Sequence, residues 1–249
     1  MSGHSKWSSI KHKKGAADAK RGKLFSKLTR AIIVAAKEGG GDPANNATLA
    51  NAIEKAKSYS MPKDNIERAI AKGTGEGSDA DALETVLYEG YGPGGVALLV
   101  AATTDNRNRT GSEIRHTFSK HGGNLGEPGS VAYLFDKKGV VVVDGEKYSE
   151  DDLMPALDAG AEDIVADDDV FEILCEPSDL TAMRAALVDA GIEVSEASVQ
   201  QRPKTLVPLD EEGATKLMKL IDTLEDLDDT DEVHANFDID AEVLERVAG

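Results

Sequence analysis

A dense polar stretch, TDNRNRTGSEIR at residues 104–115, has the composition of a phosphate-binding turn. It lies where a predicted strand gives way to a predicted helix, so free backbone N–H groups and the helix dipole favour a bound anion there. Arg107 and Arg109 can add bidentate contacts to such an anion, and Arg115 follows on the same helix. The stretch therefore predicts a nucleic-acid contact at these three arginines.

The same residues also allow a purely structural interpretation. Asp105 and Asn106 can hold the turn at the start of the helix, while the arginines pair with acidic residues of the protein's own body. The sequence leaves both interpretations open.

A second candidate site is the basic N-terminal segment. Residues 1–38 contain ten Lys and Arg but only two acidic residues, Asp18 and Glu38. Beside a polyphosphate such a segment gains free energy by releasing condensed counterions. Trp7, the single Trp of the chain, can stack on an unpaired base. The candidate contacts are Lys6, Trp7, Lys11, Lys13, Lys14, Lys20, Arg21, Lys23, Lys27 and Arg30. A solubilising tail is the alternative.

The charge of the whole chain is strongly divided. The formal net charge is -18, yet residues 1–72 contain 15 Lys and Arg against six acidic residues, which leaves 13 against 40 for residues 73–249. The two parts therefore carry +9 and -27. A protein polarised in this way approaches nucleic acid with its basic end first.

The motifs expected of an enzyme are absent from the sequence. Gly90, Gly92 and Gly95 match the letters of a dinucleotide-binding motif, but they lead into a strand rather than a helix and predict a tight turn. The five histidines lack metal-ligand spacing, and no nucleophile has a matched base. We expect no enzymatic activity, no cofactor and no metal, the distant alternative being an enzyme with a site at the TDNRNRT turn.

Three helices are predicted at the start of the chain. Apolar residues recur at helical spacing over residues 16–38, 44–59 and 62–72, and glycines follow the first and the third. These helices are expected to form a bundle, and the short second connection makes a helix-turn-helix an alternative. The Gly-, Ser- and Asp-rich stretch 73–81 predicts a linker.

The remaining elements predict two sheets. Strands are expected at residues 83–92, 96–104 and 131–135, with a helix running from a cap near Asn108 or Thr110 to Gly122. A regular βαββαβ series over residues 138–200 is typical of a ferredoxin-like sandwich. Three further elements follow this series: the segment TLVPL, a helix over 211–227 and a strand over 233–239. They should complete the first sheet, because that sheet otherwise has too few strands.

The expected fold class is α+β, with an N-terminal three-helix domain, a discontinuous α/β middle domain and an inserted ferredoxin-like βαββαβ domain. The predicted boundaries are a flexible basic arm at 1–22, the helical domain at 23–78, the middle domain at 81–136 plus 204–249, and the ferredoxin-like domain at 137–203.

Composition also narrows the class of protein. No apolar run approaches the roughly 20 residues that cross a bilayer, and the N-terminus lacks the apolar core of a signal peptide. Cys175 is the single cysteine, so an internal disulfide is excluded, and its apolar neighbours predict a buried strand. We expect a cytoplasmic protein without a membrane partner.

Five blocks of the sequence resemble the YebC/PmpR family of bacterial regulatory proteins. They are GHSKWSSIKHKK near the start, AIEKAKSYSMPKDNIERAIAKGTG at 52–75, YEGYGPGGVALLV at 88–100, TDNRNRT at 104–110 and HGGNLGEPGSVAYLF at 121–135. The resemblance implies a three-domain cytoplasmic protein with a helical N-terminal domain and two α/β domains. The segment DDTDEVHANFD departs from the family, since relatives often carry a Val-Gln pair and a Tyr there.

The resemblance implies a DNA-binding transcriptional regulator as the first functional expectation. Some members of the family, including mitochondrial relatives, act in translation at the ribosome, so a translation factor that binds ribosomal RNA is the alternative. An arm of Lys, Gly, Ser and one Trp suits an irregular folded RNA at least as well as a duplex groove.

Overall fold

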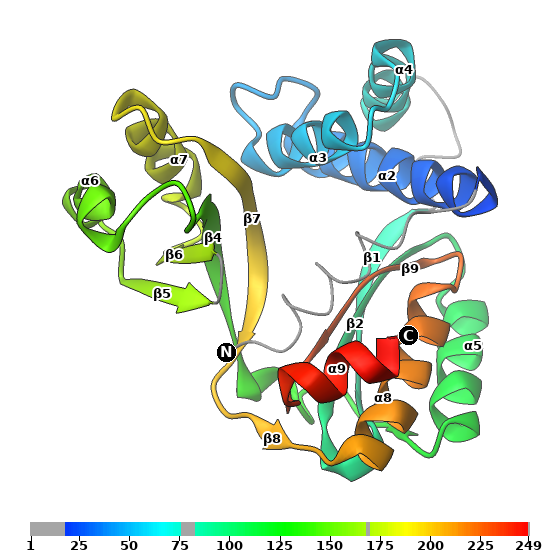
Figure 1. Ribbon diagram of the computed structural model, residues 1–249. Coiled ribbons are helices and arrows are strands. Elements are labelled where there is room, and N and C mark those ends of the chain that lie inside the picture. The colour runs from blue at the N-terminus through cyan, green and yellow to red at the C-terminus, as the bar shows by residue number, and fades with distance from the viewer. Residues whose placement is uncertain (1–17, 76–82, 168–169, 249) are drawn as a thin grey trace. The chain divides into compact units, whose positions relative to one another are not determined.

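The computed structural model describes residues 18–75, 83–167 and 170–248 of the 249-residue chain (Figure 1). Residues 1–17 and most of the predicted linker fall outside these ranges. The chain divides into two compact units, one formed by Phe135–Lys204 and the other by the residues before and after that segment. The combination of helices with antiparallel sheets confirms the α+β class.

The unit at Phe135–Lys204 has the strand order of a ferredoxin-like sandwich. Its elements are β4 (Phe135–Asp144), the 3-10 helix η4 (Glu150–Leu153), α6 (Met154–Asp158), β5 (Asp163–Asp167), β6 (Val170–Cys175), α7 (Leu180–Asp189) and β7 (Val194–Pro203). The sheet order is β5-β6-β4-β7, with every neighbouring pair antiparallel. Val141, Ile173 and Cys175 pack against Met183 and Leu187 of α7, which confirms Cys175 as a buried strand residue.

Three helices open the other unit. They are α2 (Asp18–Gly39), α3 (Ala47–Ser58) and α4 (Lys63–Gly73), with Leu28, Ile32 and Leu49 among the residues of their shared core. The predicted arm at 1–22 overlaps this first helix, because residues 18–22 belong to α2. Gly73 allows α4 to approach α2 closely, because a Cβ atom there would lie 2.4 Å from the carbonyl oxygen of Ile33.

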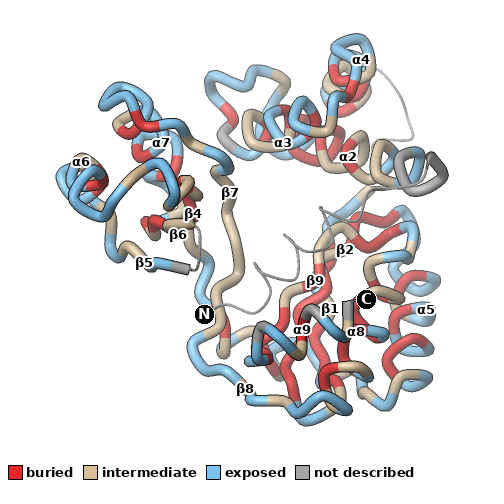
Figure 2. Tube along the Cα trace, viewed as in Figure 1, coloured by how far each residue is buried: buried red, intermediate tan, exposed pale blue. Residues whose placement is uncertain are grey.

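The same unit contains a four-stranded sheet with helices packed against it. The sheet order is β3-β1-β2-β9, from β1 (Glu84–Tyr91), β2 (Ala97–Thr104), β3 (Asn124–Leu125) and β9 (Thr230–Ala235). The helices are α5 (Arg107–Lys120), α8 (Glu211–Glu225) and α9 (Ala241–Ala248). Figure 2 shows the buried residues concentrated along β2, β9 and α8. The C-terminal segment therefore does complete the first sheet, because β9 pairs with β2.

Four details of the sequence-based prediction were wrong or incomplete. Residues 132–134 form a 3-10 helix rather than a strand, and β4 begins at Phe135. The cap of α5 is Asn106, not Asn108 or Thr110. The expected strand at 233–239 is broken at Asn236, whose side chain accepts a hydrogen bond from the Ala97 N–H at 2.7 Å, and β10 (Phe237–Asp238) pairs separately with β8 (Val207–Pro208). The helix α9 was not predicted.

A buried carboxylate explains one of the sequence blocks noted above. Glu89 on β1 accepts backbone N–H bonds from Gly129 at 2.6 Å and from Val131 and Ala132 at 2.8 Å. Burial alone would raise the pKa of Glu89, but the three N–H donors outweigh it and lower the pKa. The block GEPGSVAYL is thus a loop held in place by a strand residue from the YEGYGPGG block.

Candidate nucleic-acid interface

The first predicted contacts lie outside the described residues. These are Lys6, Trp7, Lys11, Lys13 and Lys14. Lys20 and Arg21 lie on the first turns of α2. The predicted role of all seven in binding nucleic acid stays a prediction.

The next three predicted contacts, Lys23, Lys27 and Arg30, lie on one face of α2 and bind oxygen atoms of the protein itself. Lys23 Nζ lies 3.0 Å from Asp228 Oδ1 and donates to the carbonyl of Asp226 at 3.3 Å. Lys27 Nζ donates to the carbonyl of Glu225 at 2.5 Å. Burial lowers the pKa of Lys27, and the neighbouring carboxylates offset part of that effect.

Arg30 makes two of these contacts, one of them to the buried carboxylate of Asp229. Its Nη1 lies 3.3 Å from Asp229 Oδ1, and its Nη2 donates to the carbonyl of Asp228. The side chains of Arg30 and Asp229 are 22% and 7% exposed, so this ion pair is largely shielded from water. Its Nε is buried without a hydrogen-bond partner, so the guanidinium is only partly satisfied.

All of these partners belong to one short stretch, which we call the acidic segment, residues 225–232. It has the sequence EDLDDTDE, with six acids in eight positions, and connects the end of α8 to β9. Lys55 of α3 also reaches it, through Glu232. The carbonyl groups at the end of α8 carry the negative end of the helix dipole, which adds to the attraction for cations.

Asp229 is the centre of this arrangement. Its carboxylate accepts hydrogen bonds from Thr110 Oγ1 at 2.6 Å, Arg109 Nη2 at 2.7 Å and Thr104 Oγ1 at 3.2 Å. Burial alone would raise its pKa, but the hydrogen bonds from Arg109 and Thr110 and the nearby guanidinium charges lower it. Asp229 thus joins β2, α5 and α2 as an ionised, hydrogen-bonded carboxylate.

The arginines of the TDNRNRT turn have different surroundings. Arg109 pairs with Asp105 at 2.9 Å as well as with Asp229, and Asn106 Oδ1 accepts from the Arg109 N–H at 3.1 Å. This is the arrangement expected from the structural interpretation of the turn. Arg107 is 64% exposed with its Nε 3.7 Å from Glu84.

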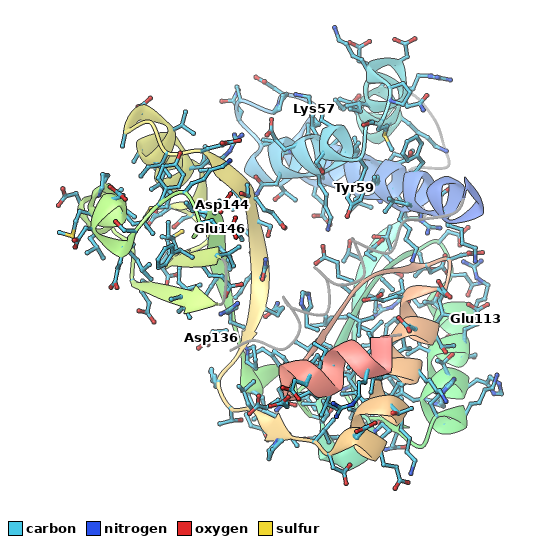
Figure 3. All side chains as sticks on the ribbon, in the orientation of Figure 1. Lys57, Tyr59, Glu113, Asp136, Asp144 and Glu146 are labelled. Atoms are coloured by element: carbon cyan, nitrogen blue, oxygen red, sulfur yellow. The ribbon has the colours of Figure 1, made fainter. Side chains whose placement is uncertain are left out.

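Arg115 is exposed on α5 and, within the described ranges, has no hydrogen-bond or ion-pair partner. Glu113 lies on the same helix (Figure 3) and lines a cavity of about 530 Å³ together with Lys23, Arg30, Arg109 and residues 226–229. Both positively and negatively charged side chains therefore line this cavity. Phosphate binding by Arg107, Arg109 and Arg115 stays a prediction.

Sequence reasoning did not find the residues that organise this site. Asp229 lies more than 100 positions along the chain from Thr104 and Thr110, and no local pattern connects it to the turn. One signal was available, because the acidic segment overlaps the stretch that departs from the YebC/PmpR pattern.

A half-buried carboxylate close to Asp229 in the chain, Asp231, gives a test of the electrostatics. Its Oδ2 accepts from Thr103 Oγ1 at 2.7 Å, while its Oδ1 is buried without a partner. Burial raises the pKa of Asp231 to about 6. This value exceeds the value of about 3.9 for an unfolded chain. The folded protein therefore binds this proton more tightly, and the stability it contributes is complete below pH 4 and lost as pH rises through 6.

We expect Asp231→Asn to remove this pH dependence. Relative to the wild type, the variant should gain roughly 2 kcal/mol in free energy of unfolding between pH 4 and pH 7, since each pKa unit corresponds to about 1.4 kcal/mol. Urea unfolding at three pH values in that range measures the difference, with the exposed Asp238→Asn as control. A difference that stays constant with pH would contradict a raised pKa.

Within the described part of the chain, no helix is both long and apolar enough to cross a membrane. No cluster of three or more His, Cys, Asp or Glu side chains suited to holding a metal ion was found in the same residues.

Comparisons with known proteins place the chain in a family. Residues 5–76 match the family model described as the TACO1/YebC protein N-terminal domain, and residues 83–237 match the TACO1/YebC second and third domain. A relative from Rubrobacter xylanophilus is 57% identical over 250 residues, and one from Desulfotalea psychrophila is 55% identical, each aligned over 100% of both chains. Both are named probable transcriptional regulatory protein.

A solved structure agrees with this assignment. The crystal structure of a conserved hypothetical protein from Aquifex aeolicus is 50% identical in sequence, with a TM-score of 0.80 over 91% of this chain and 94% of that one. The resemblance to the YebC/PmpR family is confirmed by these matches, and the chain belongs to the TACO1/YebC family.

Proposed function

We propose that the protein is a non-enzymatic, cytoplasmic regulator of gene expression that binds DNA through its basic N-terminal residues. The observation that carries the proposal is the division of charge, +9 over residues 1–72 against -27 over the rest. Counterion release favours binding of the basic residues to a polyphosphate. Repulsion of the acidic residues 73–249 by the same polyphosphate orients the protein with its basic end toward it. The names of the relatives favour transcription as the process regulated.

The paired cations of the described helices bear on how DNA is bound. Lys63 lies 3.4 Å from Glu67, Arg68 donates to Asn65 Oδ1 at 2.6 Å, and Lys57, labelled in Figure 3, lies 3.9 Å from Glu54. These exposed pairs are weak, but each places an acidic or polar partner beside the cation, so α3 and α4 present surfaces of mixed charge rather than a basic face to a phosphate backbone. We therefore assign the backbone contacts to residues 1–22, and sequence preference to DNA shape or to a structure formed on binding.

Ribosomal RNA is the second candidate, and the sequence of the arm favours it. Trp7 among Lys, Gly and Ser suits the stacking and irregular backbone contacts by which folded RNA is recognised.

Competition separates the two functions. A transcriptional regulator should select genomic fragments and bind them about a thousandfold more tightly than random DNA at the same salt. A translation factor should instead co-sediment with ribosomes at physiological salt and resist displacement by bulk DNA. Sedimentation with ribosomes in excess DNA, together with equal affinity for selected and random fragments, would replace our first function with the second.

A further inference from the structure

The three cations on α2 that bind the acidic segment face oxygen atoms in much the same way as they would face a phosphate backbone. Lys23, Lys27 and Arg30 follow at spacings of four and three residues, so they line one face of the helix over about 10 Å. Their partners are carbonyl and carboxylate oxygens at the end of α8 and just after it. Figure 1 shows α2 passing over the end of the sheet where α8 and β9 meet.

From this arrangement we infer that the acidic segment is an intramolecular mimic of phosphate that occupies Lys23, Lys27 and Arg30 until nucleic acid displaces it. The inference rests on the proposed function, and it identifies both a second set of phosphate contacts and the contact that controls access to them.

The packing allows such an exchange. The helices α2, α3 and α4 share one hydrophobic core, and the sheet with α5 and α8 has another, with no buried residue common to both. The contact between α2 and the acidic segment is therefore largely polar. The ion pair of Lys23 with Asp228 is 56% and 75% exposed, so it contributes little to stability and is weakened by salt.

The buried end of the contact is also suited to opening. If Arg30 leaves, Asp229 keeps the hydrogen bonds from Arg109, Thr104 and Thr110, so its carboxylate is not left unpaired. Arg30 has an unpartnered Nε in the closed arrangement, and a phosphate can satisfy the whole guanidinium. Opening thus leaves neither partner with a buried, unpaired charge.

Two exposed acids allow a matched experiment. Asp226→Asn with Asp228→Asn removes two negative charges that face α2, while Glu211→Gln with Glu212→Gln removes two from the opposite end of α8, about 20 Å away. Both double variants change the net charge by the same amount. Binding of a fluorescein-labelled random-sequence DNA duplex is measured for the wild type and both variants at about 0.15 M salt, where the Debye length is about 8 Å.

We expect D226N/D228N to bind the duplex roughly three- to tenfold more tightly than the wild type, with less than about a twofold change for E211Q/E212Q. Spin labels at Ser58→Cys and Ser112→Cys, on α3 and α5, give an independent readout, because D226N/D228N and added DNA should both broaden or lengthen their distance distribution. Circular dichroism checks that each variant is folded.

The outcomes separate the two proposals. Binding by the wild type with equal gains for both double variants would leave the proposed function standing and overturn the phosphate mimic. Binding by D226N/D228N alone would support the mimic strongly. If none of the three proteins binds DNA, the proposed function and the phosphate mimic are both overturned. If the wild type binds DNA but the distance between the spin labels does not respond, only the phosphate mimic is overturned.

Discussion

Removing residues 1–22 should weaken binding of duplex DNA at least about a hundredfold at moderate salt. The six cations lost are Lys6, Lys11, Lys13, Lys14, Lys20 and Arg21. The next three cations on α2 already bind the acidic segment, so they replace the lost contacts only in part. If each lost cation contacts a phosphate, the slope of log affinity against log salt should also fall by roughly five.

This deletion should leave the fold intact, because Leu28 is the first buried apolar residue among the α2 side chains that the structure describes, residues 22–39. A full-length variant with the six cations changed to Gln keeps Trp7 and separates charge from stacking. Lys57→Gln with Lys63→Gln is the control, since those lysines pair with glutamates on their own helices. A folded truncation that binds with the affinity and salt slope of the full chain would contradict an interface in residues 1–22.

Asp229→Ala should cost about 3–4 kcal/mol of stability, among the largest effects of any single change in this unit. The substitution leaves Arg109 and Arg30 without their shared carboxylate and removes the acceptor for two buried threonine hydroxyls. Such losses cost more than the net value of the ion pairs, because the largely buried Arg30 loses its charged partner and the buried Thr104 hydroxyl loses its acceptor.

Asp228→Ala is the neighbouring control for this experiment. Its side chain is 75% exposed, and its ion pair should contribute less than about 1 kcal/mol. Urea unfolding followed by circular dichroism compares the two variants, and amide exchange in β2 and β9 localises the loss to this unit. Equal stability of the two variants would show that Asp229 does not hold β2, α5 and α2 together.

Local pattern was sufficient for most of the secondary structure. Leu28 and Ile32 on the first helix, and Leu49 and Ile53 on the second, recur at helical spacing, and glycines mark the ends of the first and third helices. These signals depend only on nearby residues. The βαββαβ order of the ferredoxin-like unit followed from alternating elements in the same way. Residues 132–134 were missed because a strand-like composition can be overridden by tertiary contacts, here the hydrogen bonds from their loop to Glu89.

The sequence by itself determined the division of charge, the α+β class and the basic N-terminal residues as candidate contacts, since these depend only on composition and local order. Only the tertiary structure decided that Lys23, Lys27 and Arg30 bind the acidic segment, about 200 positions away in the chain. It likewise decided that Arg109 pairs with the buried Asp229. Electrostatic partners depend on distance and burial in the folded protein, and neither can be read from the position of a charge in the sequence.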